Sequence, residues 1–202
     1  SSDAGQKLAD FRRVVVGGQA VEAQRATAAE LADYAGRVAG TTIEVVTADR
    51  YDPAAPGLSF FVGDAASREA LKLELGPWKH EEWLLKTVPS GLILAGHDGN
   101  GPAWRISMPA GTMLAVYTLL DDHLGVKWHW PGPFGERVPS SPGAVIPEFD
   151  TRATPRFMIR SIQLGYPSTY HVKEFNEAAA KWARRARLGW TRSAVFGHSW
   201  YD

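Results

Sequence analysis

The sequence contains no cysteine and has no net charge, because 22 lysines and arginines balance 22 aspartates and glutamates. The absence of cysteine excludes disulfides, thiolate metal sites and a cysteine nucleophile, but it leaves the cellular compartment open. The charge balance removes the long-range field by which basic proteins attract nucleic acid or anionic lipid. No apolar run approaches the ~20 residues that span a bilayer. We therefore expect no nucleic-acid partner and no membrane partner.

Motifs for metal-dependent and acyl-transfer chemistry are also missing. The sequence has no His-x-x-x-His or Glu-x-x-His pair to hold a metal at helical spacing, and no Gly-x-Ser-x-Gly segment to present a serine nucleophile. The segment 96–101 has the glycine content of a phosphate loop but not its Gly-Lys-Ser/Thr ending, so we expect a surface turn there. We predict no metal, no cofactor and no catalytic residue within these 202 residues.

Two clusters of charge have plain structural interpretations. Asp121 and Asp122 are adjacent on a predicted helix and point in different directions, so they cannot work as an acid and base pair across one bond. We expect a solvated helix face. Arg184, Arg185 and Arg187 fall at the end of another predicted helix, where positive charge interacts favourably with the helix dipole.

The composition that remains is that of an ordinary globular protein. Hydrophobic residues make up 45% of the 202 positions and charged residues 22%, which suffices for one domain with a real core and a fragment of another. The eight tryptophans favour a carbohydrate partner, since tryptophan stacks on sugar rings, but the same ring also fills cores. The small, polar start at 1–6 resembles a segment left by signal cleavage, so we expect a secreted or periplasmic protein.

Alternating strand and helix patterns predict one α/β domain over residues 11–130, preceded by a tail at 1–10. Thr27 and Glu30 have the spacing of a capping box, and Gly40 and Gly125 stand just past predicted helix ends. Two apolar runs separated by Pro89 and Ser90 predict a hairpin. The predicted strands cover 11–16, 42–47, 58–62, 83–88, 91–95 and 126–130, and the predicted helices cover 27–38, 67–75 and 110–123.

A different organisation is predicted after residue 130. The prolines of 131–154 indicate a stiff linker between domains. An apolar strand beginning at Phe157, a helix over 173–187 and a second strand over 191–196 follow it. Strand, helix and strand form the unit of a parallel sheet or barrel, which two strands cannot close. We therefore predict an incomplete (β/α)8 barrel over 155–202.

Four segments resemble the accessory domain that precedes the catalytic barrel in certain glycoside hydrolases. They are similar to family 20 β-hexosaminidases and family 67 α-glucuronidases, and most closely to a bacterial family related to both, domain of unknown function 4838. The resemblance covers residues 11–150, and 154–161 and 188–200 look like the first two barrel strands. It implies a small α/β sandwich, a mixed sheet with helices, followed by the first βαβ unit of a TIM-like barrel. The four segments are 27–34, 91–96, 110–120 and 124–132.

The resemblance also implies sugar-binding residues on the barrel part. Arg160 falls where the first barrel strand of the hexosaminidases ends in an arginine that binds sugar hydroxyls, and a guanidinium also suits a uronate carboxylate. The alternative is that Arg160 pairs with a carboxylate in the barrel wall. His198 stands near a histidine of that family, and Trp200 and Tyr201 are candidates for stacking, because barrel sites form at the carboxyl ends of strands.

The implied function is glycoside hydrolysis by two carboxyl groups that later barrel strands supply. The chain is then the N-terminal part of a secreted glycoside hydrolase acting on a hexosaminide or uronide. It is inactive by itself and packs against the rest of its own barrel. This hypothesis predicts exposed apolar faces on 157–164 and 173–187. The alternative is a noncatalytic carbohydrate-binding or scaffolding module that uses the tryptophan-rich strand at 126–130.

Overall fold

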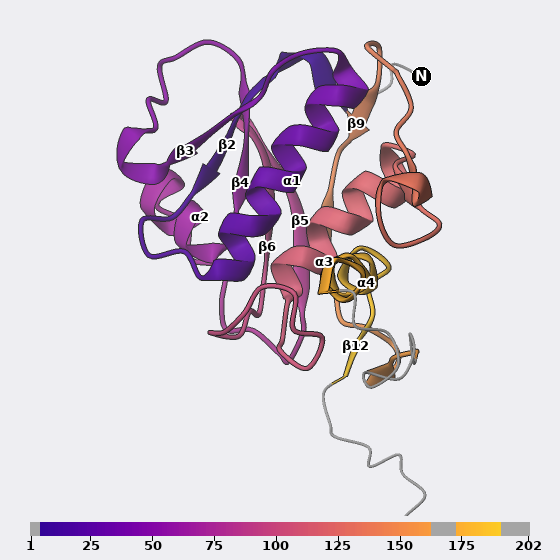
Figure 1. Ribbon diagram of the computed structural model, residues 1–202. Coiled ribbons are helices and arrows are strands. Elements are labelled where there is room, and N and C mark those ends of the chain that lie inside the picture. The colour runs from indigo at the N-terminus through magenta and orange to yellow at the C-terminus, as the bar shows by residue number, and fades with distance from the viewer. Residues whose placement is uncertain (1–4, 163–172, 191–202) are drawn as a thin grey trace, which may run out of the picture.

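The computed structural model describes residues 5–162 and 173–190, and its centre is a six-stranded mixed sheet (Figure 1). The strands lie in the order β10-β5-β6-β4-β2-β3, with β2, β3, β4 and β6 parallel and with β5 and β10 antiparallel to their neighbours. Their bounds are β2 Phe11–Val16, β3 Glu44–Thr47, β4 Leu58–Val62, β5 Trp83–Val88, β6 Gly91–Gly96 and β10 Asp150–Ala153.

Helices cover both faces of this sheet. Helix α1 (Glu22–Ala39) and helix α3 (Gly111–Thr118) contact one face, and α2 (Asp64–Leu71) contacts the other. Because neighbouring strand residues point to opposite faces, Val14 lies in the larger core and Val15 in the smaller one. Burial on both sides explains the nearly continuous apolar sequences of the central strands β4 and β6. The predicted mixed α/β domain and the 83–95 hairpin are confirmed.

The ends of the helices follow glycine signals more closely than capping signals. Gly40 ends α1 in the left-handed conformation that the sequence predicts, with φ of 69°. The start of α1 differs from the prediction, because the helix begins at Glu22 and Thr27 lies inside it. The Thr27 hydroxyl is buried and donates a hydrogen bond to the Ala23 carbonyl, so it does not cap the helix. Helix α3 continues into a π-helical turn, η3 (Leu119–His123), just before Gly125.

The segment predicted as a linker belongs to the domain. Strand β9 (Val145–Pro147) pairs with β1 (Gly5–Lys7), so part of the predicted tail is also ordered, and the short helix η1 (Leu8–Asp10) follows β1. Strand β8 (Glu136–Arg137) pairs with β7 (Lys127–Trp128), and β10 forms an edge of the main sheet. Proline content indicates a stiff chain, but it carries no information on these pairings with distant strands. The remaining short helices are η2 (Ala48–Arg50) and η4 (Pro133–Gly135).

The final described elements lie against the domain rather than beyond a linker. Helix α4 (Lys173–Arg185) contacts α3, and β11 (Ile159–Arg160) pairs with β12 (Gly189–Trp190) (Figure 1). This pairing is antiparallel and two residues long, whereas the first two strands of a barrel would be parallel. The start of a TIM-like barrel therefore stays a prediction. None of the helices described is both long and apolar enough to cross a bilayer.

Candidate functional site

Arg160 pairs with a carboxylate of the accessory domain, Glu81, which lies just before β5, whereas the alternative interpretation placed its partner in the barrel wall. Its Nη2 lies 3.1 Å and 3.0 Å from the two carboxylate oxygens of Glu81. Its Nη1 donates to the Phe157 carbonyl at 2.6 Å and its Nε to the Arg187 carbonyl at 3.0 Å. Glu81 is 2% exposed and Arg160 16% exposed at their side chains. The guanidinium therefore ties β11 and the end of α4 to the accessory domain.

Strand β12 approaches this ion pair closely at Gly189. A Cβ atom on Gly189 would lie 3.0 Å from Arg160 Nη2 and 3.1 Å from Glu81 Oε1, both tighter than ordinary van der Waals contact. The backbone of Gly189 can therefore lie against the charged pair, and no side chain separates them. Sequence reasoning placed Arg160 at the end of a strand, but it had no signal for Glu81, which lies 79 positions earlier.

A cavity of about 440 Å³ adjoins the ion pair. Lys79 and His80 supply polar groups on one side, and Phe157 and Met158 supply apolar surface on the other. The apolar surface continues along β11 and its flanks, where Phe157 is 66% exposed before the strand and Ile162 52% exposed after it. The apolar face predicted here is thus present over the described part of 157–164. The remaining predicted sugar-binding residues, His198, Trp200 and Tyr201, lie outside the described residues.

The crevice at the carboxyl ends of the parallel strands is filled by side chains. In doubly wound sheets, ligands bind at the point where two adjacent strands are followed by helices on opposite faces of the sheet. In this protein those two strands are β2 and β4. Gln24, which is 5% exposed, lies at that point and donates from Nε2 to Asp98 at 2.8 Å. Thr112 donates to the same carboxylate from its backbone nitrogen at 2.9 Å and from its hydroxyl. A Cβ atom on Gly63 would lie 2.6 Å from Gln24 Cδ, so this edge is packed.

Asp98 has a more specific environment than the predicted surface turn. Burial raises the pKa of its carboxyl to about 6, although the hydrogen bonds from Thr112 and Gln24 act to lower it. The residues of the turn are tied down by this network and by a backbone bridge between Asp98 and Ala110. The glycines around Asp98 supply turn conformations, but the acidic side chain between them holds α1 and α3 together at the sheet edge.

The raised pKa of Asp98 predicts a pH dependence of stability. A folded pKa of about 6, above the ordinary 3.8, means that the folded protein holds an extra proton in that window and loses stability as the pH rises through it. Asp98→Asn removes this titration. We expect the free energy of unfolding of this variant, relative to the unchanged protein, to increase by up to about 3 kcal/mol from roughly pH 4 to pH 7. Urea unfolding at each pH measures it, and a constant difference would contradict the assignment.

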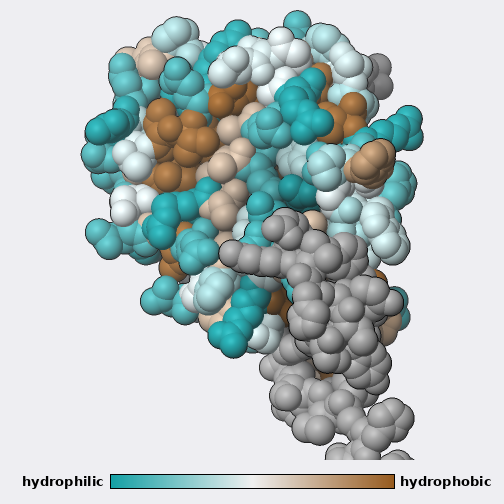
Figure 2. Space-filling model, viewed as in Figure 1, coloured by the Kyte–Doolittle hydropathy of each residue, from teal (hydrophilic) through white to brown (hydrophobic). Residues whose placement is uncertain are grey.

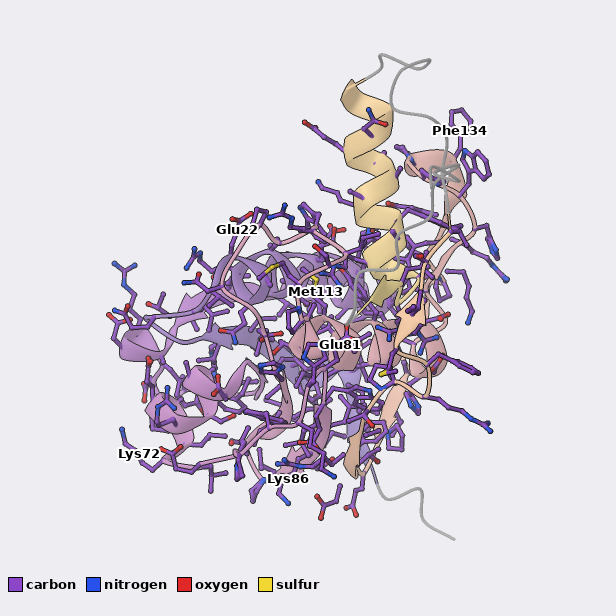
Figure 3. The ribbon with its side chains drawn as sticks, turned by 90° about the horizontal axis from the view of Figure 1, so that it is seen from below. Glu22, Lys72, Glu81, Lys86, Met113 and Phe134 are labelled. Carbon is purple, nitrogen blue, oxygen red and sulfur yellow. The ribbon has the colours of Figure 1, made fainter. Side chains whose placement is uncertain are left out.

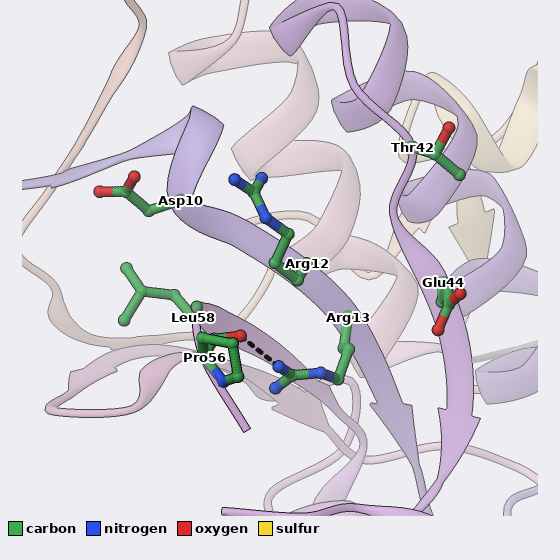
Figure 4. A pocket seen from close by; sticks show the side chains of 8 residues that line it. Asp10, Arg12, Arg13, Thr42, Glu44, Pro56 and Leu58 are labelled. Carbon is green, nitrogen blue, oxygen red and sulfur yellow. Dashed lines mark hydrogen bonds between the residues drawn. The ribbon is translucent and has the colours of Figure 1, made fainter. Parts of the chain in front are cut away.

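A wider groove of about 770 Å³ lies at the opposite, amino ends of the parallel strands (Figure 4). Asp10, Arg12 and Arg13 line it beside the start of β2, and Glu44 lies at the start of β3. Charges of both signs mix here, and Arg13 donates to the Pro56 carbonyl, as the dashed line shows. Since its arginines donate to backbone carbonyls and to the Ser59 hydroxyl, we regard this groove as polar surface. The face in Figure 2 likewise shows small apolar patches among hydrophilic side chains.

The arginines at the end of α4 do far more than interact with the helix dipole. Arg187 pairs with Asp121 and Asp122, each at 2.7 Å, so these aspartates are not simply a solvated helix face. The hydrogen bond from Arg187 is the main reason that the pKa of Asp122 lies below its usual value. Arg184 is buried, and it donates to the carbonyls of Arg105 and Met108. Sequence spacing alone had no signal for these partners.

The tryptophan-rich segment divides into a buried and an exposed part. Trp128 on β7 is buried between Tyr34 and Tyr117, whose rings meet it edge-on. Trp130, past the end of the strand, is 61% exposed, and Phe134 on the same loop is fully exposed at the edge of the view in Figure 3. Only this loop presents aromatic surface to solvent in the segment. Within residues 5–162 and 173–190, no group of three or more histidine or acidic side chains is placed to hold a metal.

Comparison with known proteins relates this fold to glycoside hydrolases. No family model matches the chain, and no curated protein matches it in sequence. A solved GH115 4-O-methyl-α-glucuronidase, with specificity for decorated arabinogalactans, aligns with 92% of the chain and 24% of its own length, at 13% identity and a TM-score of 0.52. The N-acetyl-β-hexosaminidase of Streptomyces plicatus and the GH20 β-N-acetylhexosaminidase of Streptomyces coelicolor A3(2) align over 79% of the chain, at 19% and 17% identity and TM-scores of 0.47 and 0.48.

Of these three alignments, the one with the glucuronidase bears on the fold of this chain. At 13% identity the likeness to the glucuronidase shows the fold alone, a mixed α/β arrangement that a glycoside hydrolase also contains. The chain spans about a quarter of the length of each of these three enzymes. The similarity therefore concerns one part of such enzymes, and the activity of the whole enzyme is a matter for proposal.

Proposed function

We propose that this chain is the N-terminal part of a secreted or periplasmic glycoside hydrolase that acts on a hexosaminide or uronide glycan. In this proposal residues 5–153 form an accessory domain related to those of families 20 and 67 and of the bacterial family named above. The catalytic acids come from later barrel strands. The observation that carries the proposal is the apolar surface of β11 and its flanks, where Phe157, Ile159 and Ile162 are exposed beside a cavity. Further barrel elements would cover it.

Arg160 has a supporting place in this proposal. Its guanidinium is shared among Glu81 and two backbone carbonyls, so its main task is to hold β11 on the accessory domain. The Nη1 atom of Arg160 carries two N–H groups, and one of them donates to the Phe157 carbonyl. In this proposal the other N–H group contacts the sugar. His198, Trp200 and Tyr201 remain proposed sugar contacts.

The activity of the native polypeptide tests this function. We expect the 202-residue chain to release no product from aryl N-acetylhexosaminides or aryl glucuronides, because the proposal places the paired acids on later barrel strands. An antibody raised against it should capture, from the source organism, a polypeptide several hundred residues longer that hydrolyses one of the two. Turnover by the 202-residue chain itself, or an intact native mass that ends at Asp202, would contradict the proposal.

Noncatalytic carbohydrate binding is a second candidate, because Trp130 and Phe134 present aromatic rings to solvent on one loop. It predicts heat on calorimetric titration with N-acetylhexosamine or glucuronate oligosaccharides. Trp130→Ala should weaken binding by roughly tenfold or more, since a stacked ring contributes on the order of 1–3 kcal/mol elsewhere. Phe157→Ala, which removes an exposed ring just before β11 instead, is the matched control. If neither sugar produces heat, noncatalytic binding is excluded and the glycoside hydrolase function remains.

A further inference from the structure

Arg185, in the last turn of α4, enters a socket on the accessory domain. Its Nη2 and Nε donate to the two carboxylate oxygens of Glu30 at 2.7 Å and 3.2 Å, and its Nη1 donates to Glu136 at 2.9 Å. The three side chains are 12–19% exposed. Such a fork of parallel hydrogen bonds uses the planar geometry of a guanidinium, which an ammonium group cannot reproduce.

The walls of this socket are held by contacts that do not involve α4. The Tyr117 hydroxyl donates to Glu30 at 2.8 Å, and the Tyr34 hydroxyl donates to Glu136 at 2.8 Å. Each phenol thus orients one carboxylate. Both rings meet Trp128 edge-on, at centroid distances of 5.2 Å and 5.5 Å. All five residues belong to α1, α3 and the β7–β8 hairpin, so the accessory domain alone supplies the socket.

The rings complete the recognition of a cation. The guanidinium carbon of Arg185 lies 5.4 Å from the centroid of the Tyr34 ring and 5.7 Å from that of Trp128. Burial acts to lower the pKa of Arg185, but the hydrogen bonds and charge of Glu30 raise it above its ordinary value. Arg37, about half exposed, also lies 3.8 Å from Glu136, so removal of Arg185 would leave two carboxylates facing one arginine, a net negative charge. An empty socket would therefore attract a replacement cation of the same shape.

Helix α4 is seated on the domain by both apolar and polar contacts, and its Trp182 packs against the main core. Among its described side chains, the buried apolar ones are Ala179 and Ala183, which remove little apolar area from water. Trp182 is half-buried and donates from its ring nitrogen to the Trp128 carbonyl at 2.8 Å. Polar contacts made by the end of the helix add to this packing, and those of Arg185 with Glu30 and Glu136 are more deeply buried than those of Arg187 with Asp121 and Asp122.

We propose that the accessory domain carries a preformed receptor for a guanidinium group, which Arg185 fills in cis, and that this contact determines whether α4 stays seated on the domain. The receptor would accept small guanidinium compounds when Arg185 is absent, and would discriminate against ammonium compounds. The proposal goes beyond glycan hydrolysis and does not depend on it, because its parts all lie within the described residues.

Arg185→Ala in the full chain tests the receptor by hydrogen exchange. We expect the amides of α4 to exchange on the order of a hundredfold faster or more, while those of α1 keep their protection, because one partner of a buried ion pair is lost. Millimolar methylguanidinium should restore protection to α4, and methylammonium at equal concentration should not. Arg185→Lys should resemble the alanine variant. Arg156→Ala, which removes an exposed arginine, is the matched control and should change nothing.

Three results would overturn the proposal: unchanged exchange of α4 in Arg185→Ala, equal rescue by methylammonium, or no rescue by methylguanidinium. If Arg185→Ala also loses protection in α1, then Glu30→Gln decides, since it keeps the shape of the side chain and removes one charge. Selective release of α4 in that variant supports the receptor. Full protection of α4 in Glu30→Gln would refute it.

Discussion

Replacement of Gly91 by alanine is expected to lower the free energy of unfolding of the domain by about 3–5 kcal/mol. Gly91 begins β6 with φ of 142°, a conformation that residues with a Cβ atom rarely adopt. It lies opposite Ser59 in the parallel ladder between β4 and β6. A Cβ atom built on Gly91 would lie 1.9 Å from the Ser59 carbonyl oxygen. Since the obstacle is backbone in the centre of the sheet, a change of side-chain rotamer cannot relieve the collision.

Denaturant unfolding of the Gly91→Ala variant measures this effect. Gly143→Ala is the matched control, because a Cβ atom at Gly143 would meet nothing within 4 Å. We expect the control to change stability by less than about 0.5 kcal/mol. A loss in the control equal to that in Gly91→Ala would show that the close approach of β4 and β6 is not the cause.

Replacement of Glu81 by glutamine is expected to release β11 and β12 from the accessory domain. The variant leaves the Arg160 guanidinium largely buried without its carboxylate, a change that costs about 3–5 kcal/mol in buried ion pairs. We expect amide hydrogen exchange of 157–162 and 187–190 to become faster on the order of a hundredfold or more. The reason is that loss of the ion pair lowers the free energy of local opening of these segments. The central strands should keep their protection.

Two control variants separate this effect from a general loss of acidic charge. Glu148→Gln changes an exposed side chain and should leave exchange unaltered. Glu82→Gln breaks the pair with Arg152 on β10, at 3.0 Å, and should release the sheet edge at 150–153 instead. If Glu81→Gln leaves 157–162 as protected as before, the Arg160 pair does not hold β11.

Three missed features share one physical cause. Tail and linker were predicted at 1–10 and 131–154 because small polar residues and prolines dominate them, whereas β1, β9 and β10 find their partners far along the chain. A surface turn was predicted around Asp98, because nothing in its neighbouring sequence indicates the donors on α1 and α3 that surround its carboxylate. In each case the deciding contact joins residues dozens of positions apart, and composition or periodicity within a short window does not report it.

The local features of the accessory domain are those that the sequence determined by itself. Buried β-branched and aromatic runs marked β2, β4, β5 and β6, and left-handed glycines marked the ends of α1 and η3, because these signals act between near neighbours. The tertiary structure decided what the charged residues do. Arg160 meets Glu81 across 79 positions, and Arg185 meets Glu30 across 155. Such ion pairs form only after the folded sheet and helices have brought distant side chains together and removed most water from between them.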